Sequence, residues 1–263
     1  MIYSGLDWSG SPGNEHGPWL EIAIAHVDED NMPKLDAELA RIRDELRLSP
    51  DFPFRHSETT ARTKSAFFAA VRRVPLTVHG HMLDKAAWSA QYVSGSSGFD
   101  CICDGIITLL ARCPRHVVDR QILYIDLPRR DGKLVERYRT TIRQALRRAK
   151  HPAFRDLKPR PDHRQDAAII QVADMVAGEI RAQAGIAGPY LPSLGSRIQM
   201  VQESKNPAAR RAFGSPRPYP RAGTTSRRAK TRTRFLWSLS RPPGAAPWIT
   251  KCDHKEYGAG LAC

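Results

Sequence analysis

Acidic residues end two apolar stretches that we predict to be β-strands. Asp7 follows MIYSGL and precedes the turn-forming residues Ser9 and Gly10, and Asp126 is the last residue of QILYID. In open α/β sheets the carboxyl ends of strands form an edge where ligands bind. Carboxylate oxygens are hard ligands that suit Mg²⁺ or Mn²⁺. The plainer alternatives are a turn or cap role for Asp7 and a loop role for Asp126.

Two further carboxylates belong to predicted helices. Glu58 follows FRHS at the start of a helix, and Asp174 lies within the apolar stretch AAIIQVADMVAGEI. At helical spacing Gln171 shares a face with Asp174, whereas Glu179 is expected to point elsewhere. A charged carboxylate in so apolar a helix is costly unless a cation or a donor meets it. Alternatively, Glu58 only favours a helix N-terminus, and Asp174 lies on the outer side of its helix.

The elements that must position these residues follow from the hydrophobic periodicity. Residues 1–8 and 18–28 alternate as two strands around a Gly- and Pro-rich turn, which predicts a hairpin. Further strands are expected at 74–83 and 121–126, with an extended piece at 52–55, and helices at 34–48, after 58, and at 99–113, 131–150 and 163–183. Strands that alternate with helices after a hairpin predict an α/β fold with a mixed central sheet flanked by helices.

Charge divides the chain into two parts. The whole chain has a formal charge of +14, but residues 205–263 hold 13 basic and 2 acidic residues. We therefore predict a folded domain over 1–188 and a basic, Pro- and Arg-rich tail over 189–263 that is largely disordered. The tail either adds salt-dependent affinity for phosphates or is a solvated extension.

The sequence also bears on location and redox state. No apolar run approaches the roughly 20 residues that span a bilayer, and the start lacks the pattern of a secretory signal. The 5 cysteines are an odd number, so we expect free thiols and a cytoplasmic protein.

Cysteines and histidines suggest two weaker metal sites. Cys101, Cys103, Cys113 and His116 invite a zinc interpretation, but they lie in and just after a periodic helix. On a helix, Cys-x-Cys separates its thiols by about 200°. We therefore disfavour zinc at this set. His79 and His81 share a strand face and could bind metal, although a half-exposed strand explains them equally well.

Four segments together resemble a known family. LDWSGSPG, RHSE, LYID and IQVADMVAG occur in the order of the corresponding elements of the family called domain of unknown function 3800. The resemblance covers roughly residues 1–185, and the last segment is the strongest match. Trp8 departs from the family, which more often has Glu there. The family in turn resembles the RNase H-like superfamily.

The resemblance implies an RNase H-like fold whose acidic cluster holds divalent cations. Carried over to this chain, the ligands would be Asp7, Glu58, Asp126 and Asp174, with Asp7 bridging two ions. Two Mg²⁺ or Mn²⁺ ions about 3.5–4 Å apart activate water and stabilise the departing oxygen of a phosphodiester. We therefore expect a metal-dependent nuclease without an organic cofactor, acting on DNA or RNA.

Several residues are expected to assist. The residues predicted to lie near the metal site or its phosphate are Ser9, Gly10, His56 and Gln171, and those predicted to contact nucleic acid are Arg129, Arg130 and Lys133. A structural histidine at a helix cap and a solvated basic loop are the alternatives. At the level of function, the alternatives are a non-catalytic nucleic-acid-binding module and an interaction protein of a defence system or mobile element.

Overall fold

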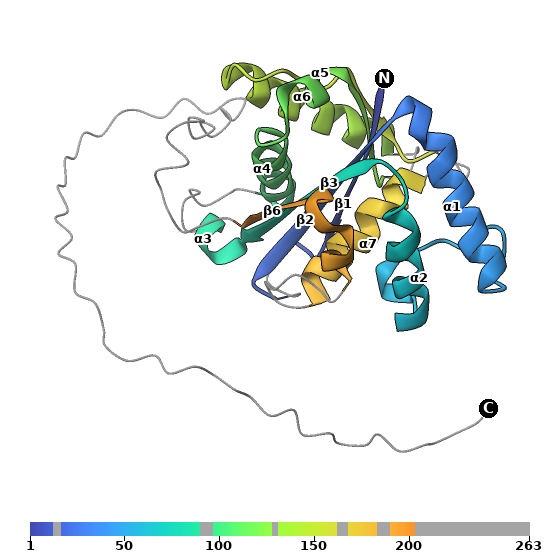
Figure 1. Ribbon diagram of the computed structural model, residues 1–263. Helices are drawn as coiled ribbons and strands as arrows, with labels where there is room; N and C mark the ends of the chain where they lie inside the picture. Colours follow the sequence, from blue (N-terminus) through green and yellow to red (C-terminus); the bar gives the residue numbers. More distant parts are fainter. Residues whose placement is uncertain (13–16, 90–96, 128–130, 162–167, 183–189, 203–263) are drawn as a thin grey trace, which may run out of the picture. The chain divides into compact units, whose positions relative to one another are not determined.

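A mixed six-stranded sheet is the centre of the computed structural model (Figure 1), which describes residues 1–12, 17–89, 97–127, 131–161, 168–182 and 190–202. Within these ranges the strand order is β5-β4-β1-β2-β3-β6. The strands are β1 (Ile2–Ser9), β2 (Trp19–Asp28), β3 (Leu76–Asp84), β4 (Gln121–Ile125), β5 (Asp156–Pro159) and β6 (Ile198–Gln202).

The opening hairpin is confirmed. β1 pairs antiparallel with β2, from Ile2 opposite Asp28 to Ser9 opposite Glu21. On its other side β1 pairs with β4 in parallel, with Leu6 beside Ile125. β3 runs antiparallel to β2, whereas β5 and β6 run parallel to β4 and β3. The predicted fold class, a mixed sheet that opens with a hairpin and is flanked by helices, is therefore confirmed.

Helices cover both faces of the sheet (Figure 1). Apolar side chains of α1 (Met32–Glu45), α2 (Ala61–Val71) and α7 (Ala168–Ala182) form one core with the sheet. Side chains of α4 (Gly98–Leu110), α5 (Arg115–Arg120) and α6 (Gly132–Arg148) form a second core. Because strand residues alternate, neighbours in β1 and β2 contribute to different cores.

Small residues let α7 lie close to the sheet. Ala23 and Ala25 of β2 belong to the α7 core, whereas Ile22 and Ile24 belong to the other. A Cβ atom on Gly5 of β1 would lie 2.2 Å from the carbonyl oxygen of Ile169. Glycine is therefore required at position 5, and α7 is brought against β1 at the point where the strand approaches Asp7.

Some elements differ from the sequence expectation. β5 and α3 (Lys85–Ser89) are short and were not predicted. A 3₁₀ segment, η6 (Leu191–Arg197), and β6 lie beyond residue 188, so the sheet extends past the expected domain boundary. Residues 203–263 of the expected tail lie outside the described residues. In the described part of the chain, none of the helices has the length and apolar character needed to cross a membrane.

Candidate metal centre

Asp7 is placed on the α7 side of the sheet by strand alternation. Leu6 faces the α4 and α6 core, so Asp7 faces the opposite way, and it is buried with 8% of its surface exposed. Gly5 of β1 lies against Ile169 of α7. From there, the two strand residues to Asp7 and the five helix residues to Asp174 each advance the chain by about 7 Å. That advance brings Asp174 of α7 level with Asp7.

Asp126 reaches the same place from β4. The strand ends at Ile125, and the backbone N–H of Asp126 donates to the carbonyl oxygen of Leu6 at 3.1 Å. Because β4 runs parallel to β1, the carboxyl ends of both strands lie at one edge. Arg160 Nη1 contacts Asp126 Oδ1 at 2.6 Å, so this carboxylate already has a cationic partner.

The electrostatics show that the three aspartates act on one another. Burial raises the pKa of Asp7 well above its ordinary value, and the charges of Asp126 and Asp174 raise it further. Burial also raises the pKa of Asp174, and Asp126 adds to that effect. The interaction between the side chains of Asp7 and Asp174 raises the pKa of Asp7 and lowers that of Asp174. Among the described residues, these three aspartates do not form a group whose carboxylate oxygens all lie within 4.8 Å of one another.

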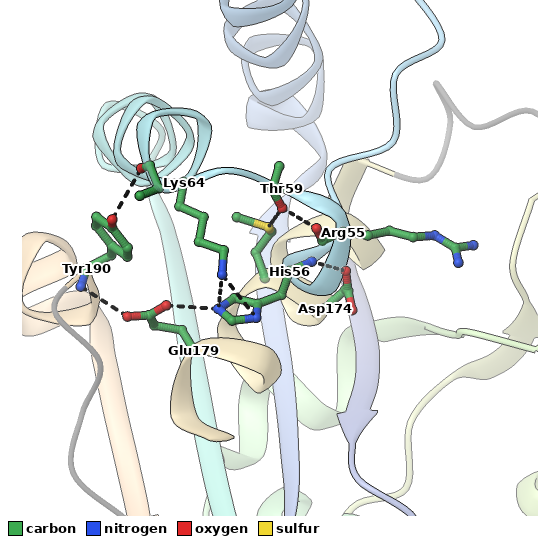
Figure 2. Close-up of polar contacts among 9 residues, drawn as sticks. Arg55, His56, Thr59, Lys64, Asp174, Glu179 and Tyr190 are labelled. Carbon is green, nitrogen blue, oxygen red and sulfur yellow. Dashed lines mark hydrogen bonds and ion pairs between the residues drawn. The ribbon is translucent and has the colours of Figure 1, made fainter. Parts of the chain in front are cut away.

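Figure 2 shows how Asp174 is held by the segment before α2. The backbone N–H of His56 donates to Asp174 Oδ2 at 3.0 Å. His56 begins a 3₁₀ turn, η3 (His56–Glu58), that packs on α7. A Cβ atom on Gly178, one turn after Asp174, would lie 2.3 Å from His56 Cβ. Gly178 therefore allows the close approach on which the bond to Asp174 depends.

The His56 ring belongs to a polar cluster beside the aspartates (Figure 2). His56 Nε2 lies 3.0 Å from Glu179 Oε2 and 2.9 Å from Lys64 Nζ. Burial lowers the pKa of His56, and the charge of Lys64 lowers it as well, whereas Glu179 opposes both effects. Glu179 also accepts a hydrogen bond from the backbone N–H of Tyr190 at 3.3 Å.

Glu179 corrects the sequence interpretation. It does not point away from the site but is buried, with 2% of its side chain exposed, against His56. Helical spacing puts Glu179 on a different side of α7 from Asp174. Glu179 nevertheless belongs to the site, because His56 contacts Asp174 through its backbone and Glu179 through its ring.

Glu58 is not brought to the aspartates in this structure. Its side chain is 56% exposed and lies 3.6 Å from Arg55 Nη1. Glu58 is absent from the charges that act on Asp7 or Asp174, whereas Arg55 acts on Asp174. The expected set of four carboxylates is therefore a set of three here.

The assisting residues have different positions. Gln171 Oε1 accepts from the Phe54 backbone N–H at 3.0 Å and from Arg43 Nη2 at 3.3 Å, so Gln171 anchors the segment that precedes His56. Ser9 lies on the same strand face as Asp7, two residues on. Gly10 has a φ of 93°, a conformation that favours glycine.

Glu21 is a buried carboxylate that the sequence analysis missed. It lies opposite Ser9 in the hairpin, on the face that carries Asp7. Its Oε2 atom has no hydrogen-bond partner among the described residues. Burial raises its pKa, and the charges of Arg181 and Lys85 oppose that shift. Its position inside a strand of alternating apolar residues was the one signal that could have found it.

The predicted nucleic-acid contacts are only partly described. Lys133 is exposed at the start of α6, and Arg129 and Arg130 lie outside the described residues. Two arginines of α6 pack against the protein itself: Arg137 stacks over Phe99, and Arg143 lies over Phe154.

Comparison with solved structures finds backbone likeness to RNase H structures. Ribonuclease H2 from Pyrococcus horikoshii OT3 has a TM-score of 0.45 and 15% identity, over 73% of this chain and 83% of that one. A mutant of Bst-RNase HIII has a TM-score of 0.45 and 15% identity, over 70% of this chain and 52% of that one. Bst-RNase HIII in complex with Mn2+ has a TM-score of 0.37 and 17% identity, over 69% and 55%.

This chain thus spans about half the length of the two RNase HIII structures. No protein-family model matches the sequence, and no curated protein matches it.

Proposed function

We propose that the protein is a divalent-metal-dependent phosphodiester hydrolase that acts on nucleic acid, with Asp7, Asp126 and Asp174 as the metal ligands. The observation that carries the proposal is the convergence of three carboxylates from β1, the end of β4 and α7 at one edge of the sheet. Such mutual repulsion at a partly buried site is typical of functional sites.

The three residues fit a hard divalent cation. Asp7 is buried beside two other carboxylates, and among the described residues no cationic side chain acts on it. Burial and the charges of Asp126 and Asp174 raise the pKa of Asp7, so its ionised form is unfavourable without a cation. The three carboxylates would offer a bound cation oxygen ligands of the kind that Mg²⁺ and Mn²⁺ prefer.

Each residue has a definable task in this proposal. When bound, the ion supplies an activated water and stabilises the departing oxygen of the phosphodiester. Asp7, on which both other aspartates act, would hold the ion together with each of them. His56 acts through its backbone as a positioning residue, because its N–H fixes Asp174 Oδ2. Glu179 holds the His56 ring, and Gln171 anchors Phe54, two residues before His56, so both help to keep the His56 N–H directed at Asp174.

Arg160 is suited to meet the substrate. Its guanidinium contacts Asp126 at the rim of the cluster, where both side chains are partly exposed. A guanidinium binds phosphate oxygens as well as carboxylates. We propose that Arg160, which contacts Asp126 in the free protein, would bind a phosphate of the substrate.

A cleavage assay with Mg²⁺ or Mn²⁺ on single-stranded, duplex and hybrid nucleic acids tests the proposal. The wild type and Asp44→Asn, which removes an exposed carboxylate far along α1, should cleave. Asp7→Asn and Asp174→Asn should lose at least about a hundredfold in rate, since each removes a proposed ligand. Equal rates in all four proteins reject the assignment. Binding that weakens with salt but ignores chelator, without cleavage, favours the non-catalytic alternative.

Membership in the domain of unknown function 3800 family remains a proposal, supported by the order of its four segments. Three of those segments carry the aspartates that converge here, which is the geometry that the resemblance implies. A cytoplasmic location likewise stays a prediction.

A further inference from the structure

A second cluster of metal-ligating side chains lies on the opposite face of the sheet. His26 of β2, His79 of β3 and Cys113, three residues after the end of α4, are all buried. One ligand atom from each lies within 4.8 Å of the other two. They belong to the α4 and α6 side, since Ile24, opposite His79 in the register, packs in that core. The aspartates lie on the other side.

The spacing within this cluster matches that of ligands around one ion. His26 Nε2 lies 3.6 Å from Cys113 Sγ. A tetrahedral zinc ion with Zn–S of about 2.3 Å and Zn–N of about 2.0 Å separates its sulfur and nitrogen ligands by about 3.6 Å. The ring centroids of His26 and His79 are 5.2 Å apart and the rings lie edge to face, so both imidazoles reach the same space.

A neighbouring hydrogen-bond chain orients the His26 ring. Ser4 Oγ donates its single hydrogen to Gln121 Oε1 at 3.0 Å. Ser4 must therefore accept the 2.8 Å bond from His26 Nδ1, which carries the ring hydrogen. That tautomer leaves the Nε2 lone pair facing Cys113. Fixing a histidine ligand through its other nitrogen is the usual arrangement at metal sites.

We propose that His26, His79 and Cys113 form a binding site for a borderline-soft divalent ion, Zn²⁺ above all. Two imidazoles and a thiolate select zinc over the hard ions expected at the aspartates. Three protein ligands leave the fourth tetrahedral position to water or another small ligand. Binding replaces the Cys113 thiol proton, which is released to solvent, and no oxidant or reductant is needed.

The proposed site differs from the zinc set considered in the sequence analysis. Cys101 and Cys103 are buried on α4, and His116 is exposed on α5. Of that set only Cys113 joins the cluster, and its partners come from two strands that are distant in the sequence. The ion would tie β2, β3 and the end of α4 together and so stabilise the sheet.

Metal analysis and Co²⁺ spectroscopy of the full chain test the inference. Because the site is buried, the protein is produced in cells supplied with Zn²⁺ or Co²⁺, so that loading accompanies folding. We expect about one tightly held Zn²⁺ per chain. The Co²⁺ form should show the near-ultraviolet thiolate-to-cobalt absorption band. Absence of both from the folded wild type overturns the proposal without the need for any variant.

Variants locate the ion. Cys113→Ala and Cys113→Ser should lose the band, and Cys103→Ala, which removes a buried thiol from the same core, should keep it. His79→Gln should weaken retention of the ion. A band that persists in folded Cys113→Ser, or disappears equally in Cys103→Ala, contradicts the assignment. Asp7→Asn should keep the band, so failure of the hydrolase proposal leaves this one standing.

Discussion

Asp7 of β1 lies so near Asp174 of α7 that the charge of Asp174 raises the pKa of the Asp7 carboxyl, which burial already raises well above its ordinary value. Such a pair is unfavourable in the absence of a cation. The charge of Asp126 raises the pKa of both carboxyls as well. Acidic groups kept together in this way are expected where stability is given up for a binding site.

The first prediction concerns this unfavourable pair. In chelator, Asp7→Asn should raise the free energy of unfolding by roughly 1 kcal/mol, the scale of a single substitution. Asparagine still accepts from the Trp8 N–H, which bonds Asp7 Oδ1 at 2.7 Å, and removes one repelling charge. Urea denaturation measures the change. Asp44→Asn, at an exposed position, should have no effect, and a clear loss of stability in Asp7→Asn would refute this view of the pair.

The second prediction concerns the contact between α7 and His56. Gly178→Ala should destabilise the protein by about 1–3 kcal/mol, because the new methyl group would lie 2.3 Å from His56 Cβ. Helix propensity alone would favour alanine by about 1 kcal/mol, so the clash must outweigh that gain.

Gly132→Ala is the matched control. A Cβ atom at Gly132, in the first turn of α6, meets no atom within 4 Å. This variant should be neutral or slightly stabilised in thermal denaturation. If Gly178→Ala behaves like Gly132→Ala, His56 does not pack on α7 as described.

The third prediction is a pH dependence of stability that depends on Glu21. Burial raises its pKa above the ordinary 4.5, so the folded state binds this proton more tightly than the unfolded state does. The resulting stabilisation is complete below pH 4.5 and is lost as the pH rises through the raised value. The wild type should therefore gain stability relative to Glu21→Gln between pH 7 and pH 4.5. Denaturant titrations of both proteins at several pH values measure the difference, and a constant difference contradicts the prediction.

The sequence predicted those parts of the fold that depend on local periodicity. The hairpin, the strand that ends before Asp126 and the apolar helix around Asp174 each have a clear repeat, and a parallel arrangement of β1 and β4 brings their ends together. β5 and β6 are short, and they exist through pairing with β4 and β3. No local pattern contains that information.

The candidate site was only partly predicted for the same reason: local sequence patterns do not contain long-range contacts. Glu58 was expected beside the aspartates because RHSE resembles the corresponding element of the family, but the 3₁₀ turn directs it outward toward Arg55. Glu21, Glu179 and the His26 cluster depend on contacts between residues distant in the sequence, which only the folded chain reveals.

The central claim is that Asp7, Asp126 and Asp174 hold a hard divalent ion. Titration with Mn²⁺, followed by electron paramagnetic resonance of the free ion, tests it most directly. We predict saturable binding to the wild type and to Asp44→Asn, with affinity lowered by more than about tenfold in Asp7→Asn and Asp174→Asn. Equal Mn²⁺ affinity in all four proteins would contradict the account.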